Sequence, residues 1–182
     1  MRFNHREIYN KKYFDTSLGV NQITDSKGNV ISTNHVSDRN RWESWTPILS
    51  VLKGILHPTP QSLLDCGCGA GYAVWKALEL GFDARGIDIS PDAIELGWTE
   101  SKKYIQVAAL SEIPYEDNRF DIVISSSVME HIFVDELDIV LDEMFRVSKK
   151  WVFLNIDGTS EYKYKFQIKQ DEDIPEERYY DM

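Results

Sequence analysis

Apolar and polar positions follow two different periods along the chain, and the change between them divides the sequence into elements. Short continuous apolar runs are typical of strands buried on both faces. Apolar positions three and four residues apart indicate helices with one buried face. On this basis strands are predicted at residues 62–66, 83–89, 104–108, 120–125 and 151–156, and helices at 41–56, 73–80, 91–97 and 134–147.

Strand and helix patterns alternate from residue 62 to residue 156. Alternation of this kind predicts an α/β fold with a mainly parallel sheet, right-handed crossovers and helices on both faces. Residues 1–46 are predicted to form an N-terminal extension or lid, with a possible strand at Asn29–Thr33, and residues 47–182 the main domain. Near the C-terminus, Tyr162–Ile168 alternates like one late strand, and the acidic run Asp171–Glu177 is expected to be a solvated tail.

Composition narrows the class of protein. The 182 residues are 42% apolar and 27% charged, which is ordinary for a globular domain with its own core. The formal net charge of −10 disfavours a nucleic acid as the main partner, because such binding depends on clustered lysine and arginine. No apolar run approaches the roughly 18–20 residues of a membrane span. The N-terminus lacks the apolar stretch of a signal peptide, so a cytoplasmic location is expected.

The most informative segment is Leu63-Leu64-Asp65-Cys66-Gly67-Cys68-Gly69-Ala70-Gly71. It joins a predicted strand to a predicted helix through three alternating glycines, here called the glycine turn (residues 67–71). Glycine permits a sharp turn and lets a ligand approach the backbone closely. The spacing Gly-x-Gly-x-Gly departs from the dinucleotide pattern Gly-x-Gly-x-x-Gly, which disfavours a nicotinamide cofactor. The two cysteines within this segment are expected to be small buried residues rather than redox or metal groups.

An acid follows the second predicted strand. Asp88 lies 17 residues after Gly71, in Gly86-Ile87-Asp88-Ile89-Ser90. An acid at this place accepts hydrogen bonds from ribose hydroxyls in dinucleotide folds. The alternative interpretation is a solvated or helix-capping acid. Together with the glycine turn, Asp88 favours a ligand that carries a ribose.

Four segments in order resemble class I S-adenosylmethionine-dependent methyltransferases, in particular the type 11-like group that acts on small molecules and glycans. They are the glycine turn with its preceding strand, Gly86–Ser90, Ile113–Ser125 and Ser127–Ile132. The resemblance covers about residues 60–156. It implies a Rossmann-like, doubly wound sheet, with the late antiparallel strand pair short or missing here. It also implies S-adenosylmethionine as cofactor and S-adenosylhomocysteine as product.

The resemblance assigns roles to individual residues. Asp65 would order the turn near the cofactor's amino group, and Asp88 would hold the ribose. Most members carry an acid for the adenine amino group where this chain has Ala109, so that contact is missing or supplied by Glu112, while the Leu110 backbone N–H remains available. The other implied cofactor contacts are the backbone of Gly67, Cys68 and Gly69, the side chain of Ile89 against adenine, and Ser125 and Ser126 beside the methionyl group.

The acceptor side offers weaker signals. His131, with Glu130 beside it, is the candidate general base for a hydroxyl acceptor, although the same pair could instead brace the next helix. An Asn-Pro-Pro-Tyr pattern, which serves amino-group acceptors, is absent after the strand at 120–125. The expectation is therefore methyl transfer to a small-molecule or sugar hydroxyl, with no metal involved. The alternative is a catalytically degenerate, cofactor-binding or scaffold protein, or a methyltransferase fragment.

Overall fold

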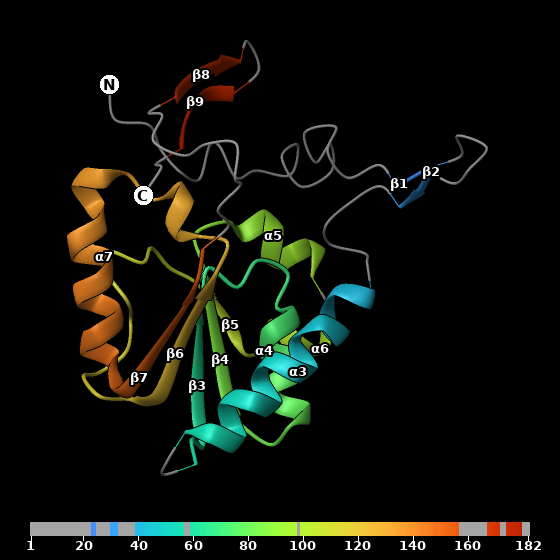
Figure 1. Ribbon diagram of the computed structural model, residues 1–182, viewed down its shortest axis with the longest axis vertical. Helices are drawn as coiled ribbons and strands as arrows, with labels where there is room; N and C mark the ends of the chain where they lie inside the picture. Colours follow the sequence, from blue (N-terminus) through green and yellow to red (C-terminus); the bar gives the residue numbers. More distant parts are fainter. Residues whose placement is uncertain are drawn as a thin grey trace.

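The computed structural model describes residues 23–24, 30–32, 39–56, 59–97, 99–156, 167–171 and 174–179, with side chains within 45–156. Its centre is a five-stranded parallel sheet in the order β5-β4-β3-β6-β7 (Figure 1). The chain builds outward from β3 to β4 and β5, then returns to the other side of β3. The strands are β3 (Ser62–Cys66), β4 (Asp83–Asp88), β5 (Ile105–Val107), β6 (Phe120–Ser126) and β7 (Ser148–Asn155).

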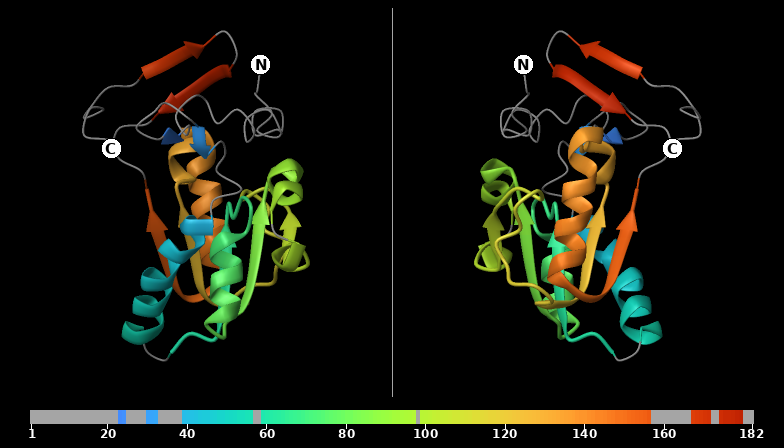
Figure 2. Two further views of the ribbon diagram at one scale, coloured as in Figure 1. Left: turned by 90° about the vertical axis from the view of Figure 1, so that its right-hand side faces the viewer. Right: turned by 90° about the vertical axis from the view of Figure 1, so that its left-hand side faces the viewer.

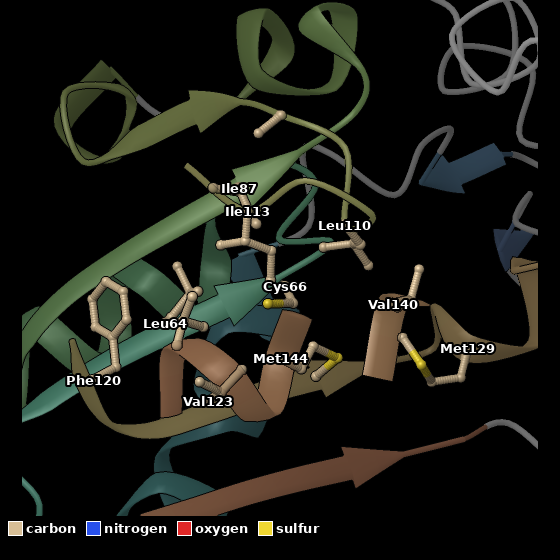
Figure 3. Close-up of a cluster of buried hydrophobic side chains, with 12 residues drawn as sticks. Leu64, Cys66, Ile87, Leu110, Ile113, Phe120, Val123, Met129, Val140 and Met144 are labelled. Carbon is tan, nitrogen blue, oxygen red and sulfur yellow. The ribbon is translucent and has the colours of Figure 1, made fainter. Parts of the chain in front are cut away.

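Helices cover both faces of the sheet (Figures 1 and 2). The helices α3 and α4 supply Leu49, Leu52 and Val74 to a buried cluster with Leu63 and Ile122. A second buried cluster, on the opposite face, joins alternate strand residues to α7 (Figure 3). The helical elements are α3 (Arg39–Ile55), α4 (Tyr72–Glu79), α5 (Pro91–Leu96), α6 (Thr99–Lys102), the 3-10 turn η2 (Met129–His131) and α7 (Val134–Val147).

This sheet confirms the fold class expected from the sequence. Helix α7 has the predicted bounds, and α5 begins as predicted, with the Ser90 hydroxyl accepting the Ala93 N–H at 3.1 Å and Pro91 in the first position. Strand β7 begins three residues earlier than predicted, at Ser148, whose buried hydroxyl donates to the Trp151 carbonyl. The one-turn helix α6 was not predicted, because its short polar sequence has no apolar period.

Two further antiparallel pairs are present among the described residues. Strand β1 (Ile23–Thr24) pairs with β2 (Val30–Ser32), and β8 (Gln167–Asp171) pairs with β9 (Ile174–Tyr179), which lies beside η2. Part of the acidic run expected to be a solvated tail is strand, because Asp171 ends β8 and residues 174–177 belong to β9. A hairpin satisfies its backbone groups through pairing, which an acidic composition does not prevent.

Two expectations fall partly outside these ranges. The predicted late strand overlaps β8 only at residues 167–168, and residues 162–166 are not described. Helix α3 runs across the proposed boundary between residues 46 and 47, and the division into an extension and a domain stays a prediction. In the described part of the chain, no helix is both long and apolar enough to cross a membrane.

Candidate cofactor site

The glycine turn leads from β3 into α4 at the carboxyl end of the sheet. Gly67, Gly69 and Gly71 have φ angles of 79°, 50° and 81°, which L side chains rarely adopt. A Cβ on Gly67 would lie 2.4 Å from Val128 Cγ2, and one on Gly71 would lie 2.4 Å from Ile105 Cδ1. Packing against neighbouring side chains, together with the positive φ angles, therefore favours glycine at these two positions.

Gly69 differs from its neighbours in the turn. A Cβ built on Gly69 would meet no heavy atom of the described residues within 4 Å. Internal packing thus does not explain the absence of a side chain at this position. A backbone without a side chain, at a turn between strand and helix, is where a ligand can approach most closely.

Asp88 ties the glycine turn to the start of α5. Its Oδ2 accepts the Gly69 N–H at 2.7 Å, and its Oδ1 accepts the Ser90 N–H at 2.8 Å. Burial raises the pKa of Asp88, and these two hydrogen bonds act in the opposite direction. Each carboxylate oxygen keeps a second lone pair for a further donor. The carboxylate is therefore held in one orientation without being saturated.

A second acid, Asp65, lies beneath the turn in β3 and is 4% exposed. Burial, together with the charge of Asp88, raises its pKa to about 7. No hydrogen bond to another described residue lowers this value. A buried and a partly buried carboxyl group beside this turn favour a ligand that brings positive charge and hydroxyl donors.

The cysteines behave as packing residues. Cys66 and Cys68 are free and buried, and burial raises the pKa of both thiols well above the usual range. Cys68 Sγ would lie 2.7 Å from a Cβ on Gly86, so this glycine makes room for the cysteine. Protonated, buried thiols are poor nucleophiles and metal ligands.

The segment after β5 forms the next wall of the site. The Ala108 N–H donates to the Asp88 carbonyl at 2.9 Å, which holds this segment beside β4. Ala109 is partly buried and Leu110 is buried, while Glu112 is exposed and donates its N–H to the Ala109 carbonyl at 3.2 Å. The segment therefore offers backbone groups and apolar surface, with Glu112 as its nearest acid in sequence.

The end of β6 contains the two predicted serines. The buried Ser125 hydroxyl donates to the Cys66 carbonyl at 2.9 Å, which ties the end of β6 to the start of the glycine turn. The Ser126 hydroxyl accepts from Asn155 Nδ2 at 2.9 Å, and the Ser127 N–H, at a φ of 54°, donates to the Asn155 carbonyl at 2.8 Å. Asn155 was not predicted. The available signal was its place as the first polar residue after the apolar run of β7.

The predicted acid–base pair lies in η2, on the same edge of the sheet. His131 and Glu130 are both partly buried. Glu130 Oε2 is itself buried, and it has no hydrogen-bond partner among the residues that the structure describes. A buried carboxylate oxygen of this kind is usually satisfied by a hydrogen-bond donor, so Glu130 Oε2 is available to a donor group.

S-adenosylmethionine fits these residues. Its ribose hydroxyls match the free lone pairs of Asp88, its positive charges match the acidic surroundings of Asp65, and the open backbone at Gly69 accommodates close approach. Within the described ranges, no group of three metal-ligating side chains is present.

Curated relatives match about half of this chain. Norajmaline N-methyltransferase from Rauvolfia serpentina is 31% identical over 97 residues, 49% of this chain and 32% of the relative. The tRNA U34 carboxymethyltransferase from Hahella chejuensis is 34% identical over 57% of this chain and 32% of its own. A ubiquinone biosynthesis O-methyltransferase from Paraburkholderia phymatum is 30% identical over 42% and 35%. Each match spans about a third of the relative's length.

The fold and the family follow from two further comparisons. The crystal structure of the PH0226 protein from Pyrococcus horikoshii superposes with a TM-score of 0.56 at 23% identity, covering 65% of this chain and 60% of that one, which shows the fold. The family model described as "Methyltransferase domain" matches residues 64–154, half of the chain. The chain therefore belongs to this family, the class I methyltransferases whose cofactor is S-adenosylmethionine.

Proposed function

We propose that the protein binds S-adenosylmethionine at the carboxyl edge of β3 and β4 and transfers its methyl group to a hydroxyl of a small molecule or sugar. The observation that carries this proposal is the arrangement of Gly69, Asp88 and Asp65. It combines a turn backbone without a side chain at Gly69 with the buried carboxyl group of Asp65 and the partly buried one of Asp88, at the point where the sheet order reverses. Ligands of open parallel sheets bind at such a point.

The chain's contribution to the reaction is mainly to hold and orient the cofactor. When bound, S-adenosylmethionine supplies a methyl group on a positively charged sulfur, which is already a good leaving group. Asp88 would hold the ribose, Ile89 and Leu110 would border the adenine, and the β6 end at Ser126 would border the methionyl group. Positioning of donor and acceptor supplies a large part of the rate enhancement in such displacements.

The acceptor must enter beyond the end of β6, beside η2. His131 is the proposed base that takes the proton from an acceptor hydroxyl, with Glu130 next to it. Glu130 Oε2 is buried and has no hydrogen-bond partner within the described ranges, which supports a ligand donor at this place. The relatives act on different acceptors by their names, and one of them is a tRNA enzyme. The net charge of −10 and the Ser125–Val128 sequence support a small hydroxyl compound over RNA, and a cytoplasmic location stays a prediction.

Calorimetric titration with S-adenosylmethionine and S-adenosylhomocysteine tests the binding step. We expect Asp88→Ala to weaken both affinities at least about tenfold, because a hydrogen bond to a charged group contributes roughly 1.5–3 kcal/mol. The matched control is Asp83→Ala, which removes an acid from the opposite end of the same strand, where it pairs with Arg85 and Arg119. Equal losses in the two variants, or none in Asp88→Ala, would contradict the ribose assignment.

Methyl transfer is tested with methyl-labelled cofactor and a panel of phenols, sugars, amines and bulk tRNA. We expect label in a hydroxyl compound, and loss of transfer with unchanged cofactor affinity in His131→Ala. Label in tRNA or an amine would overturn the acceptor class. Ala109 favours the second candidate function, a cofactor-binding protein without turnover, because it removes the usual adenine contact. That function requires binding with no labelled product across the panel.

A further inference from the structure

Helix α7 carries an ion pair with unusually complete geometry. Arg146 Nε lies 2.6 Å from Glu143 Oε1, and Arg146 Nη2 lies 2.8 Å from Glu143 Oε2. The two side chains are 31% and 19% exposed, so the pair lies at the surface and is only partly covered by protein. Two parallel bonds of this kind give directional rigidity that a single contact between point charges does not.

The Glu143–Arg146 ion pair forms hydrogen bonds to the backbone of the segment that connects β5 to β6. The Ile113 N–H donates to Glu143 Oε2 at 2.7 Å, and the Ile113 carbonyl accepts from Arg146 Nη2 at 2.9 Å. Arg146 Nη1 donates to the Tyr115 carbonyl and to Asp117 Oδ1, both at 2.8 Å. Both backbone groups of Ile113 are therefore bound by one ion pair on another element.

These contacts lie close to Leu110, which is proposed to border the adenine. Only two residues separate Leu110 from Ile113, and the Glu112 N–H closes a turn onto the Ala109 carbonyl at 3.2 Å. Leu110 and Ile113 are both buried in the cluster that contains Val140 of α7 (Figure 3). A segment this short and this well packed has little conformational freedom. A displacement of the Ile113 backbone therefore also displaces Ala109 and Leu110.

We infer that Glu143 and Arg146 are positioning residues for the adenine end of the cofactor site, acting through the backbone of Ile113. The inference rests on the proposed cofactor binding. It assigns to α7 a role in ligand affinity although neither side chain belongs to the proposed site. The ion pair also keeps its charge under all ordinary conditions, since Arg146 lowers the pKa of Glu143 and the pKa of Arg146 is itself raised. The positioning therefore does not depend on a change in the charge of either residue.

The test compares Arg146→Met, Arg146→Lys and Glu143→Gln with the wild-type chain. Binding of S-adenosylhomocysteine and of adenosine is measured by calorimetry, and loop mobility by hydrogen exchange of residues 109–118. The control is Lys149→Met, which removes a cation bound to Asp121 at 3.1 Å instead of to the loop. We expect Arg146→Met to weaken both ligands by a similar factor, about three- to thirtyfold, which is the usual size of coupling through a packed network.

We expect the ligand affinities of Arg146→Lys to lie between those of wild type and Arg146→Met. Lysine keeps the positive charge but cannot form the two parallel hydrogen bonds of arginine. Faster exchange in the loop with affinities within about twofold of wild type would overturn the inference, since the pair would then stabilise the fold alone. A loss for S-adenosylhomocysteine but not for adenosine would also overturn it. If Arg146→Met does not fold, the same binding and exchange measurements on Glu143→Gln test the inference. Absence of binding by the wild-type chain would overturn the proposed function and this inference together.

Discussion

At the residue scale, aspartates of this protein ionise over a wide range because their surroundings differ. Asp121 accepts N–H groups of Gln61 and Ser62 and pairs with Lys149, and its pKa falls to about 2. Asp65 has no such donors in the described part of the chain, and its pKa rises to about 7. Burial penalises the charged form unless hydrogen bonds or opposite charges compensate. Asp65 therefore carries a cost that a positively charged ligand would remove.

We predict that Asp65 makes folding stability fall with rising pH. Its pKa is higher in the folded chain, about 7, than the usual 3.8, so the folded state binds the extra proton between these values. The stabilisation is complete below about pH 4 and is lost as the pH rises through about 7. Without added cofactor, the free energy of unfolding of wild type relative to Asp65→Asn should drop by up to about 4 kcal/mol from pH 4 to pH 8.

Urea unfolding of both proteins across this pH range measures the difference. Asp121, whose pKa is about 2 in the folded chain, contributes equally to both proteins and cancels in the comparison. Parallel stability curves for wild type and Asp65→Asn would show that the Asp65 carboxyl group is solvated. The position of this acid was predictable from the sequence, but its protonation was not, because protonation depends on which donors surround it in three dimensions.

At the element scale, strands and helices were predictable where local patterns and caps agree. The Ser90-Pro91 start and the apolar period of α7 each contain enough local information to define an element. The glycine turn was equally predictable. Its sequence does not show, however, that Gly67 and Gly71 pack against other described side chains while Gly69 does not. That distinction arises because Val128 and Ile105, far away in sequence, pack against Gly67 and Gly71.

We predict that Gly69→Ala weakens cofactor binding while Gly81→Ala does not. Both glycines have positive φ angles, 50° and 83°, and a Cβ at Gly81 would meet only Lys53 Nζ, at 3.5 Å. Each substitution therefore costs a similar backbone strain, on the order of 1–2 kcal/mol. Only the methyl group at Gly69 would occupy the space proposed for the ligand. S-adenosylhomocysteine affinity, measured well below the melting temperature, should fall about tenfold or more in Gly69→Ala alone. Similar affinities in the two variants would mean that the ligand does not approach Gly69.

At the scale of the whole molecule, the site consists of loops that the sheet order brings to one edge. The reversal of strand order beside β3 places the glycine turn, Asp88 and the end of β6 together, and element order predicts such a topology. Contacts between distant elements were not predictable in this way. Two examples are the hydrogen bonds from Arg146 to the Ile113 carbonyl and from Asn155 to the Ser126 hydroxyl. Both depend on side-chain packing between different elements. The β8–β9 pair was missed because its acidic composition favours solvent.

The proposed cofactor contacts all lie between Asp65 and Ser126, inside the family segment 64–154. They also bridge β3, β4, the β5–β6 connection and β6, so a bound ligand ties together much of the sheet's carboxyl edge. We therefore predict that S-adenosylhomocysteine at 100 times its Kd stabilises the 182-residue chain by about 2.7 kcal/mol, a rise in Tm of roughly 5–10 °C. Differential scanning calorimetry measures this rise, with NAD at equal concentration as the control. An equal rise with NAD would contradict the selectivity inferred from the glycine spacing, and no rise with S-adenosylhomocysteine would show that this edge of the sheet does not hold the cofactor.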